Sequence, residues 1–240
     1  MNAVAHKGTQ RTEIISSFWM RAFAFLIACA ESAGGQLAGR EPIVGGPCEG
    51  CEAIFQDLPS DLSATARIAP RGEPGEPMRI EGKVMHQDGT AAAGTIVYAY
   101  HTNAEGIYPR DDRFRSQPAY RHGILRGWVK ADEEGRYRFD TVRPGGYPNS
   151  DMPQHVHMHV IEPGRCTYYI DSIVFEDDPR LTAEKRDQYE HGRGGTGISK
   201  LRRDQGVWRV ERDIILGEGI PDYPTDAQQG DASDHAPRRR

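Results

Sequence analysis

Residues 78–102, MRIEGKVMHQDGTAAAGTIVYAYHT, alternate apolar and polar side chains on both sides of an Asp88–Gly89 pair. Alternation with a period of two is typical of half-buried β-strands, and an Asp-Gly pair favours a tight turn. The stretch therefore predicts one strand on each side of that turn.

The strand pattern returns in the rest of the chain. Residues 125–142 carry it on both sides of an acidic turn, and further apolar segments follow at 154–162, 168–175 and 207–216. Only one short segment, 181–191, has the composition of a helix. Many short strands separated by turns predict an all-β protein with an antiparallel β-sandwich, in preference to a barrel.

Changes in composition divide the chain into four segments. Residues 1–35 are predicted to be a targeting segment or disordered. Residues 36–77 are rich in glycine, proline and acidic residues, which predicts an irregular, extended lead-in that contains a CxxC motif. The sandwich domain is predicted over 78–220. Residues 221–240 are polar and lack periodicity, which predicts a disordered tail.

The first segment contains a candidate export signal. Residues 20–35, MRAFAFLIACAESAGG, combine one basic residue, a short apolar run and small residues, as secretory signals do. The run ends in LIAC, which resembles a bacterial lipobox with Cys29 as the lipidated residue. The alternative is a short buried or interfacial helix. Two localisations stay open: export, as a periplasmic, secreted or lipid-anchored protein, or residence in the cytoplasm.

Charge and hydropathy exclude two classes of partner. The chain has 240 residues, a net charge of −5 and 30 basic residues. The basic residues are dispersed, so they predict no surface that tracks nucleic-acid phosphates. No apolar run is long enough to span a bilayer, which predicts no integral membrane segment.

The cysteines outside the candidate signal fall into a pair and a single residue. Cys48 and Cys51 form PCEGC. A lone CxxC with no second pair or nearby histidine is a weak zinc signal, and a thioredoxin-like motif would follow a strand. Export would favour a disulfide between the two. Cys166 is predicted to be an inert buried thiol.

Three histidines alternate in residues 149–164, NSDMPQHVHMHVIEPG. On a strand, His155, His157 and His159 share one face, and the apolar residues between them share the other. Protonated neighbours on one face would repel each other, whereas a metal would use their neutral nitrogens. The pattern alone leaves a metal site and an ordinary solvent-facing strand both open, and it does not select a metal.

Two loops add tyrosines: Tyr108 in NAEGIY and Tyr147 in GRYRFDTVRPGGYP. These elements, followed by MPQHVHM and VFEDDP, come in the order and spacing of one known family. Over about residues 78–180, the chain resembles the intradiol ring-cleavage dioxygenases, which include protocatechuate 3,4-dioxygenase and catechol 1,2-dioxygenase. The joint match of four ordered elements is far more specific than any single one.

The resemblance implies that Tyr108, Tyr147, His155 and His157 are the ligands of a non-haem Fe(III) ion. Ferric iron is a hard cation, and phenolate oxygen is a hard anionic ligand that favours it over Fe(II). His159 matches none of the family's ligands and is predicted to be an outer-shell or surface residue.

The same resemblance implies a reaction in aromatic catabolism. A catechol-type small molecule and O2 would be the partners, and ring opening between the two hydroxylated carbons would give a muconate-type diacid. Tyr147 would be the catalytic residue, because it leaves the metal when the catechol binds and takes up a substrate proton. The oligomeric state stays open.

The pocket departs from the family pattern. The family arginine that lies over the bound ring corresponds to Met152, and the glutamine that accompanies it corresponds to Ser172. Arg126, Arg143 and Arg113 are candidates for supplying the missing positive charge. These differences leave open which catechol is cleaved.

Three alternative hypotheses for the function remain open. The first is an iron-binding family member with weak or altered activity. The second is another metalloenzyme, with a cupin-like site of three histidines and an acid. The third is a non-catalytic binding module, because the sandwich fold also serves binding roles.

Overall fold

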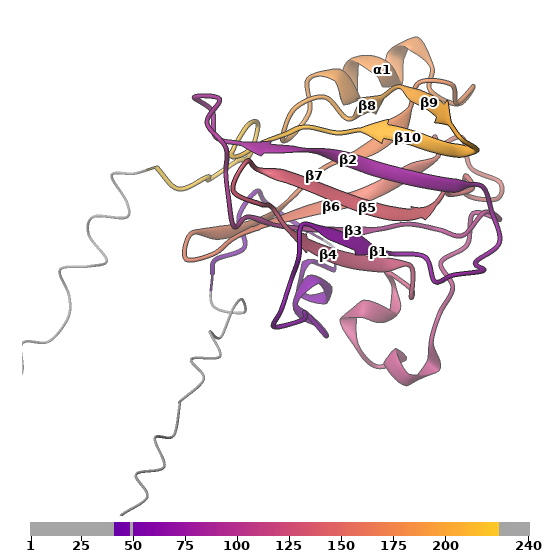
Figure 1. The fold of residues 1–240 in the computed structure, drawn as a ribbon, viewed down its shortest axis with the longest axis horizontal. Coiled ribbons are helices and arrows are strands. Elements are labelled where there is room, and N and C mark those ends of the chain that lie inside the picture. The colour runs from indigo at the N-terminus through magenta and orange to yellow at the C-terminus, as the bar shows by residue number, and fades with distance from the viewer. Residues whose placement is uncertain (1–40, 49, 226–240) are drawn as a thin grey trace, which may run out of the picture. The chain divides into compact units, whose positions relative to one another are not determined.

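Two packed β-sheets form the framework of the computed structural model, which describes residues 41–48 and 50–225 (Figure 1). The first sheet has the order β1–β5–β2–β10–β9, and β11 also pairs with β2. Its strands are β1 (Thr65–Arg67), β2 (Pro77–Met85), β5 (Arg136–Val142), β9 (Leu201–Asp204), β10 (Val207–Glu211) and β11 (Ile214–Ile215).

The second sheet has the order β4–β3–β6–β7–β8. Its strands are β3 (Ile96–Tyr100), β4 (Arg126–Lys130), β6 (His155–Glu162), β7 (Cys166–Phe175) and β8 (Ile198–Ser199). Within the described residues, the helical elements are one α-helix and three 3₁₀ turns: α1 (Ala183–Glu190), η1 (Cys51–Phe55), η2 (Asp112–Phe114) and η3 (Pro118–Tyr120). The predicted all-β sandwich is thus confirmed, and α1 lies inside the segment with helical composition.

The sheets are mixed, although the sequence predicted antiparallel ones. β1–β5, β2–β10, β2–β11 and β7–β8 are parallel pairs, and the remaining neighbours are antiparallel. A parallel neighbour cannot follow through a tight hairpin and must return through a long connection. Local alternation reports that a segment is a strand, but it carries no information about which distant strand lies beside it.

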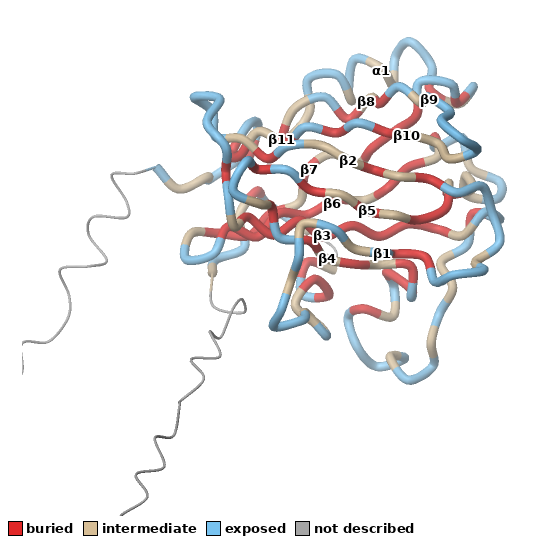
Figure 2. The backbone as a smooth tube through the Cα atoms, in the orientation of Figure 1, coloured by how far each residue is buried: buried red, intermediate tan, exposed pale blue. Residues whose placement is uncertain are grey.

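Alternation along the strands builds the core between the sheets. Ile80 and Phe139 of the first sheet and Val97, Val156 and Ile173 of the second are fully buried in one cluster. Figure 2 shows this burial as red segments along the strands, with exposed loops around them. The side chains between these positions in the second sheet face away from the core, and this outer face positions the site.

The described part of the predicted lead-in packs on that outer face. Ile54 of η1 is fully buried against Tyr98 and other residues of the second sheet. The indole Nε1 of Trp128 donates to Ile54 O at 2.7 Å, and the Arg126 guanidinium donates to Gln56 O at 2.9 Å. Further along, β1 joins the first sheet beside β5. The ordered framework therefore begins before residue 78.

Residues 207–216 form β10 and β11 in place of one predicted strand. The break falls at Arg212, whose side chain is fully buried and donates to carbonyls including Gly194 O at 3.0 Å. Of the predicted tail, the structure describes 221–225, where Tyr223 Oη donates to Glu162 at 3.0 Å. Among the described residues, no helix is long and apolar enough to cross a membrane. The candidate export signal lies outside the described residues.

Candidate metal centre

The outer face of the second sheet gathers the predicted donors. On β6, Val156, Met158 and Val160 point into the core, as the alternation predicted. The pairing of β6 with β7 shifts register between Val156 and Met158, where Asp171 and Ser172 of β7 together lie opposite His157. The histidine side chains consequently lie on the face opposite the core.

Four side-chain atoms from three segments converge. Tyr108 Oη lies 2.5 Å from Tyr147 Oη and 2.8 Å from His157 Nε2. His155 Nε2 lies 3.0 Å from His157 Nε2 and 3.1 Å from Tyr147 Oη. The remaining short pair, Tyr147 Oη and His157 Nε2, is 3.4 Å apart. Two phenol oxygens and two imidazole nitrogens thus surround one point, which is the arrangement of a ligand shell.

Glycines bring the two tyrosine loops together. The backbone at Gly106 has φ of +81°, and a Cβ there would overlap the carbonyl oxygen of Gly146. Asn103 Oδ1 accepts the amides of Glu105 and Ile107, which closes the turn that leads to Tyr108. Gly145 N donates to Asn103 O at 2.8 Å, so the loops are also joined by a backbone hydrogen bond. The NAEGIY and PGGYP elements therefore form one unit that places both phenols.

Each ligand imidazole is oriented through its other nitrogen. His155 Nδ1 lies 2.8 Å from Pro153 O, and because a carbonyl only accepts, Nδ1 carries the proton. Nε2 of His155 then presents a lone pair to the centre. His157 Nδ1 contacts Ser172 Oγ at 3.3 Å. The His157 ring also stacks on Tyr100, with centroids 4.4 Å apart.

Burial keeps the metal-free donors uncharged. It raises the pKa of the Tyr108 phenol, and the hydrogen bond to Tyr147 raises it further. Burial also raises the pKa of Tyr147 and lowers the pKa values of His155 and His157. Neutral imidazoles are ready ligands, whereas each phenol must lose a proton to a bound cation. A donor set that becomes doubly anionic on binding fits a highly charged, hard cation, so the residues present fit ferric iron.

A cavity of about 780 Å³ opens beside the donors, with Tyr108, His157 and Ser172 in its wall. Two arginines also line it, Arg110 and Arg121. Neither arginine could be predicted from the sequence, because their positions depend on the path of residues 109–125 through η2 and η3, which have no strand periodicity.

The predicted pocket residues separate into those at the cavity and those away from it. Ser172 lines it, as expected. Met152 is 42% exposed and lies outside the described cavity lining. The Arg126 side chain is only 7% exposed, but it is held against η1 through Gln56 O and Asp57. Arg126 therefore stabilises the docked lead-in and does not line the cavity.

The other two candidate arginines are also engaged elsewhere. Arg143 forms a two-pronged ion pair with Asp177 and stacks on Trp208. Arg113 pairs with Asp111, and its side chain is 80% exposed. Neither is among the lining residues of the cavity.

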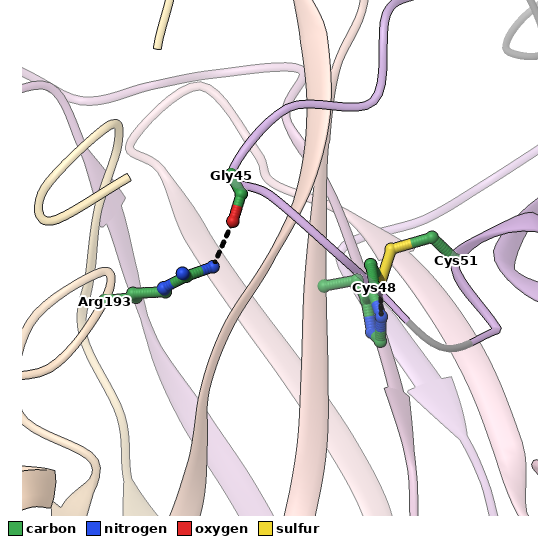
Figure 3. The surroundings of a disulfide bond; sticks show 5 residues. Gly45, Cys48, Cys51 and Arg193 are labelled. Atoms are coloured by element: carbon green, nitrogen blue, oxygen red, sulfur yellow. Dashed lines mark hydrogen bonds between the residues drawn. A yellow bond between two sulfur atoms is a disulfide. The ribbon is translucent and has the colours of Figure 1, made fainter. Parts of the chain in front are cut away.

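His159 was predicted to be an outer-shell or surface residue, and its burial excludes the second alternative. It is 4% exposed, and its Nε2 lies 3.7 Å from Cys48 Sγ. Cys48 and Cys51 are joined in a disulfide with Cα atoms 5.6 Å apart, and Cys48 lines the cavity (Figure 3). Cys166 is a buried free thiol, as predicted, and burial raises its pKa to about 12.

Comparisons with known proteins agree with this geometry. The family model described as Dioxygenase matches residues 54–188. The protocatechuate 3,4-dioxygenase beta chain of Burkholderia cepacia is 31% identical over 133 residues, covering 52% of this chain and 57% of that protein. Catechol 1,2-dioxygenase 2 of Acinetobacter lwoffii is 29% identical over 151 residues, covering 56% and 51%. The chain therefore spans about half the length of the curated relatives it matches.

Solved structures show the same fold. An intradiol ring-cleavage dioxygenase from Tetranychus urticae matches with a TM-score of 0.52 at 16% identity, covering 78% of this chain and 96% of that one. The dioxygenase domain of a carbohydrate-binding fusion protein from Streptomyces sp. SirexAA-E matches with a TM-score of 0.51 at 18% identity, covering 66% and 91%. With the family model matching more than half of its residues, the chain belongs to the intradiol ring-cleavage dioxygenase family.

Proposed function

We propose that this protein is an Fe(III)-dependent intradiol dioxygenase. It cleaves a catechol-type ring between the two hydroxylated carbons with O2 and releases a muconate-type diacid. The convergence of Tyr108, Tyr147, His155 and His157 on one point carries the proposal. Bound there, ferric iron supplies a Lewis-acidic centre that holds a catecholate and activates it toward O2.

Once a bound cation has displaced the proton of Tyr147, its phenolate would be the group that takes up a substrate proton. Its Oη lies within 3.1 Å of His155 Nε2 and 2.5 Å of Tyr108 Oη, so it sits among groups that share protons. It stands on the loop that enters β6, whereas Tyr108 packs against the buried cluster under η1. Displacing the Tyr147 side chain therefore requires less free energy than displacing that of Tyr108. Tyr147 is thus the phenol suited to give up its place to the substrate.

The cavity favours an anionic catecholate. Arg110 and Arg121 place positive charge in its wall, next to Tyr108 and His157. Both arginines are exposed, and their positive charge attracts an ionised catechol toward the cavity. These arginines take the place that the sequence prediction gave to Arg126, Arg143 and Arg113.

The visible spectrum of the iron-loaded full chain tests the proposal. Tyrosinate bound to Fe(III) gives a visible charge-transfer band, and a productive catechol shifts it before ring-opened product appears. Tyr108→Phe and Tyr147→Phe each should weaken the band and lower turnover, because each removes one phenolate. Tyr120→Phe, which removes a phenol outside the donor set, serves as the matched control and should leave both unchanged.

A colourless protein that holds one iron per chain would refute the phenolate ligands. Coloured iron protein whose spectrum shifts with catechols but yields no ring-opened product would show an iron-binding protein without the proposed activity. A panel of catechols with and without a carboxylate identifies the preferred substrate through the same spectral shift.

A further inference from the structure

A second cluster of metal-binding side chains lies beside the first. The Sγ atoms of Cys48 and Cys51 and a ring nitrogen of His159 all lie within 4.8 Å of one another. Cys48 is partly buried, whereas Cys51 and His159 are 1% and 4% exposed. The motif that looked weak in the sequence, because no histidine was near it, thus receives a histidine from β6, a segment more than a hundred residues later.

His159 has little else to bind. Its Nε2 faces Cys48 Sγ at 3.7 Å, and its Nδ1 is buried without a hydrogen-bond partner among the described residues. A buried imidazole that makes only a weak contact to sulfur has lost its hydrogen bonds to water without full replacement. Coordination of a metal through Nε2 would replace that weak contact with a strong one.

His122 lies at the same loop, but it is not part of the group of close donor atoms, which contains only Cys48, Cys51 and His159. Its Nε2 lies only 2.6 Å from where a Cβ at Gly50 would stand, so it rests directly on the turn between the two cysteines. Its Nδ1 is engaged with Tyr98 Oη at 2.8 Å, which leaves Nε2 for the loop. The ring centroids of His122 and His159 are 6.1 Å apart.

From this arrangement we infer that the reduced Cys48–Cys51 pair, with His159, forms a binding site for a soft divalent cation such as Zn²⁺. Two thiolates and one imidazole, with a fourth position for water, are a known donor set for zinc, and the two-residue spacing within CEGC is the usual one. The iron centre differs in having oxygen and nitrogen donors. Tyr100 links the iron centre to the cysteine loop, because its ring stacks between His157 and His122.

The disulfide state and the metal-bound state exclude each other. Two molecules of a small thiol reduce the disulfide: its S–S bond breaks, each cysteine sulfur gains an electron and a proton, and the two reagent sulfurs become joined. Zn²⁺ then binds both sulfurs and releases their two protons. The structure with the disulfide is therefore the oxidised form of this site (Figure 3).

Co²⁺ titration of the full chain tests the inference, with Tyr108→Phe/Tyr147→Phe as the background in which the iron centre is disabled. The protein is reduced with thiol, freed of it without air, and titrated with Co²⁺ and then with Zn²⁺. One equivalent of Co²⁺ should give thiolate charge-transfer bands and strong tetrahedral visible bands, and Zn²⁺ should erase them. The oxidised protein should show neither band.

Variants locate the ligands. His159→Ala should weaken Co²⁺ binding by more than about 100-fold, because removing even an outer-shell partner costs roughly 10–100-fold. Cys166→Ser removes a thiol outside the cluster and should change nothing. Bands that persist in Cys48→Ser/Cys51→Ser, or reduced protein that shows no thiolate bands, would overturn the inference.

If variants at the cluster fail to fold, alkylation of the unsubstituted protein provides a second test. In reduced protein, Zn²⁺ should protect Cys48 and Cys51 from alkylation by iodoacetamide. Mass spectrometry of the peptides measures this protection. Labelling of Cys166 after unfolding provides the reference for complete alkylation. Equal labelling with and without Zn²⁺ would contradict the site.

Discussion

Gly106 shows how a single residue without a side chain can bring two phenols together. Its positive φ and its close approach to the Gly146 carbonyl allow the loops of Tyr108 and Tyr147 to touch. Any other residue would both strain the backbone and push the loops apart. The phenols would then no longer lie at the 2.5 Å separation that closes the donor set.

We therefore expect Gly106→Ala to weaken iron binding and bleach the visible band. Backbone strain of this kind is on the order of 1–3 kcal/mol, and the overlap with Gly146 adds to it. Gly89→Ala is the matched control, since Gly89 also has positive φ, +83°, but a Cβ there meets nothing within 4 Å. Denaturant unfolding and iron titration of both variants separate the two effects. Equal iron affinity in both would show that the loop contact is unimportant.

At the scale of elements, β2 and β5 are joined by a charged cross-strand pair as well as by their ladder. Arg79 and Asp140 stand opposite each other, with Arg79 Nε 2.9 Å from the carboxylate, and Arg138 adds a second contact at 2.7 Å. Burial by itself would raise the pKa of Asp140, but the hydrogen bonds and charges of both arginines outweigh it and lower that pKa.

A lowered pKa in the folded state fixes the sign of the pH effect. The pair stabilises the fold above the unfolded pKa of about 3.9, and that contribution is lost as the pH falls through the folded pKa. Asp140→Asn should lower the free energy of unfolding by about 1 kcal/mol at pH 7. It should have no effect at a pH where Asp140 is protonated in the wild type. Denaturant titrations at both ends of this range measure it, with exposed Asp61→Asn as control. A pH-independent difference would show that packing, and not charge, matters here.

For the whole molecule, buried histidines set the response to acid. His101 is fully buried at the end of β3, where Nδ1–H donates to Thr102 O and Nε2 accepts from Thr141 Oγ1. Burial lowers the pKa of His101 to about 4, and the charge of nearby His155 acts in the same direction. His101 is thus neutral in the folded protein where an unfolded chain would begin to bind a proton.

We expect stability to fall as the pH drops from about 6.5, the unfolded value, to the folded value near 4, with a loss of about 3 kcal/mol from His101. His101→Gln should be less stable at neutral pH, but its free energy of unfolding should change less with pH across this range. Thermal unfolding of the metal-free protein between those pH values checks it, and exposed His86→Gln should keep the wild-type slope. An unchanged slope in His101→Gln would contradict the assignment.

What the sequence could predict was what it encodes locally or in ordered motifs. Alternation placed Val156, Met158 and Val160 in the core, and motif order selected four donors that the structure brings together. The cavity arginines and the neighbours of His159 could not be predicted, because they depend on how loops without periodicity dock on the sheet. The position of Arg126 outside the cavity lining could not be predicted for the same reason: its guanidinium donates to the backbone of Gln56, far away in the sequence.

The docking of the lead-in over the second sheet also determines the order in which parts of the chain fold. Residues 51–58 leave the ribosome before the strands that they cover, yet Ile54 is buried only when β3, β4 and β6 have formed the face beneath it. The contacts of Ile54 O with Trp128 and of Gln56 O with Arg126 span 74 and 70 residues. Such distant contacts close late, because a long loop must be ordered before they are made. This early segment is therefore expected to be fixed late, over the sheet that carries His155 and His157 on β6.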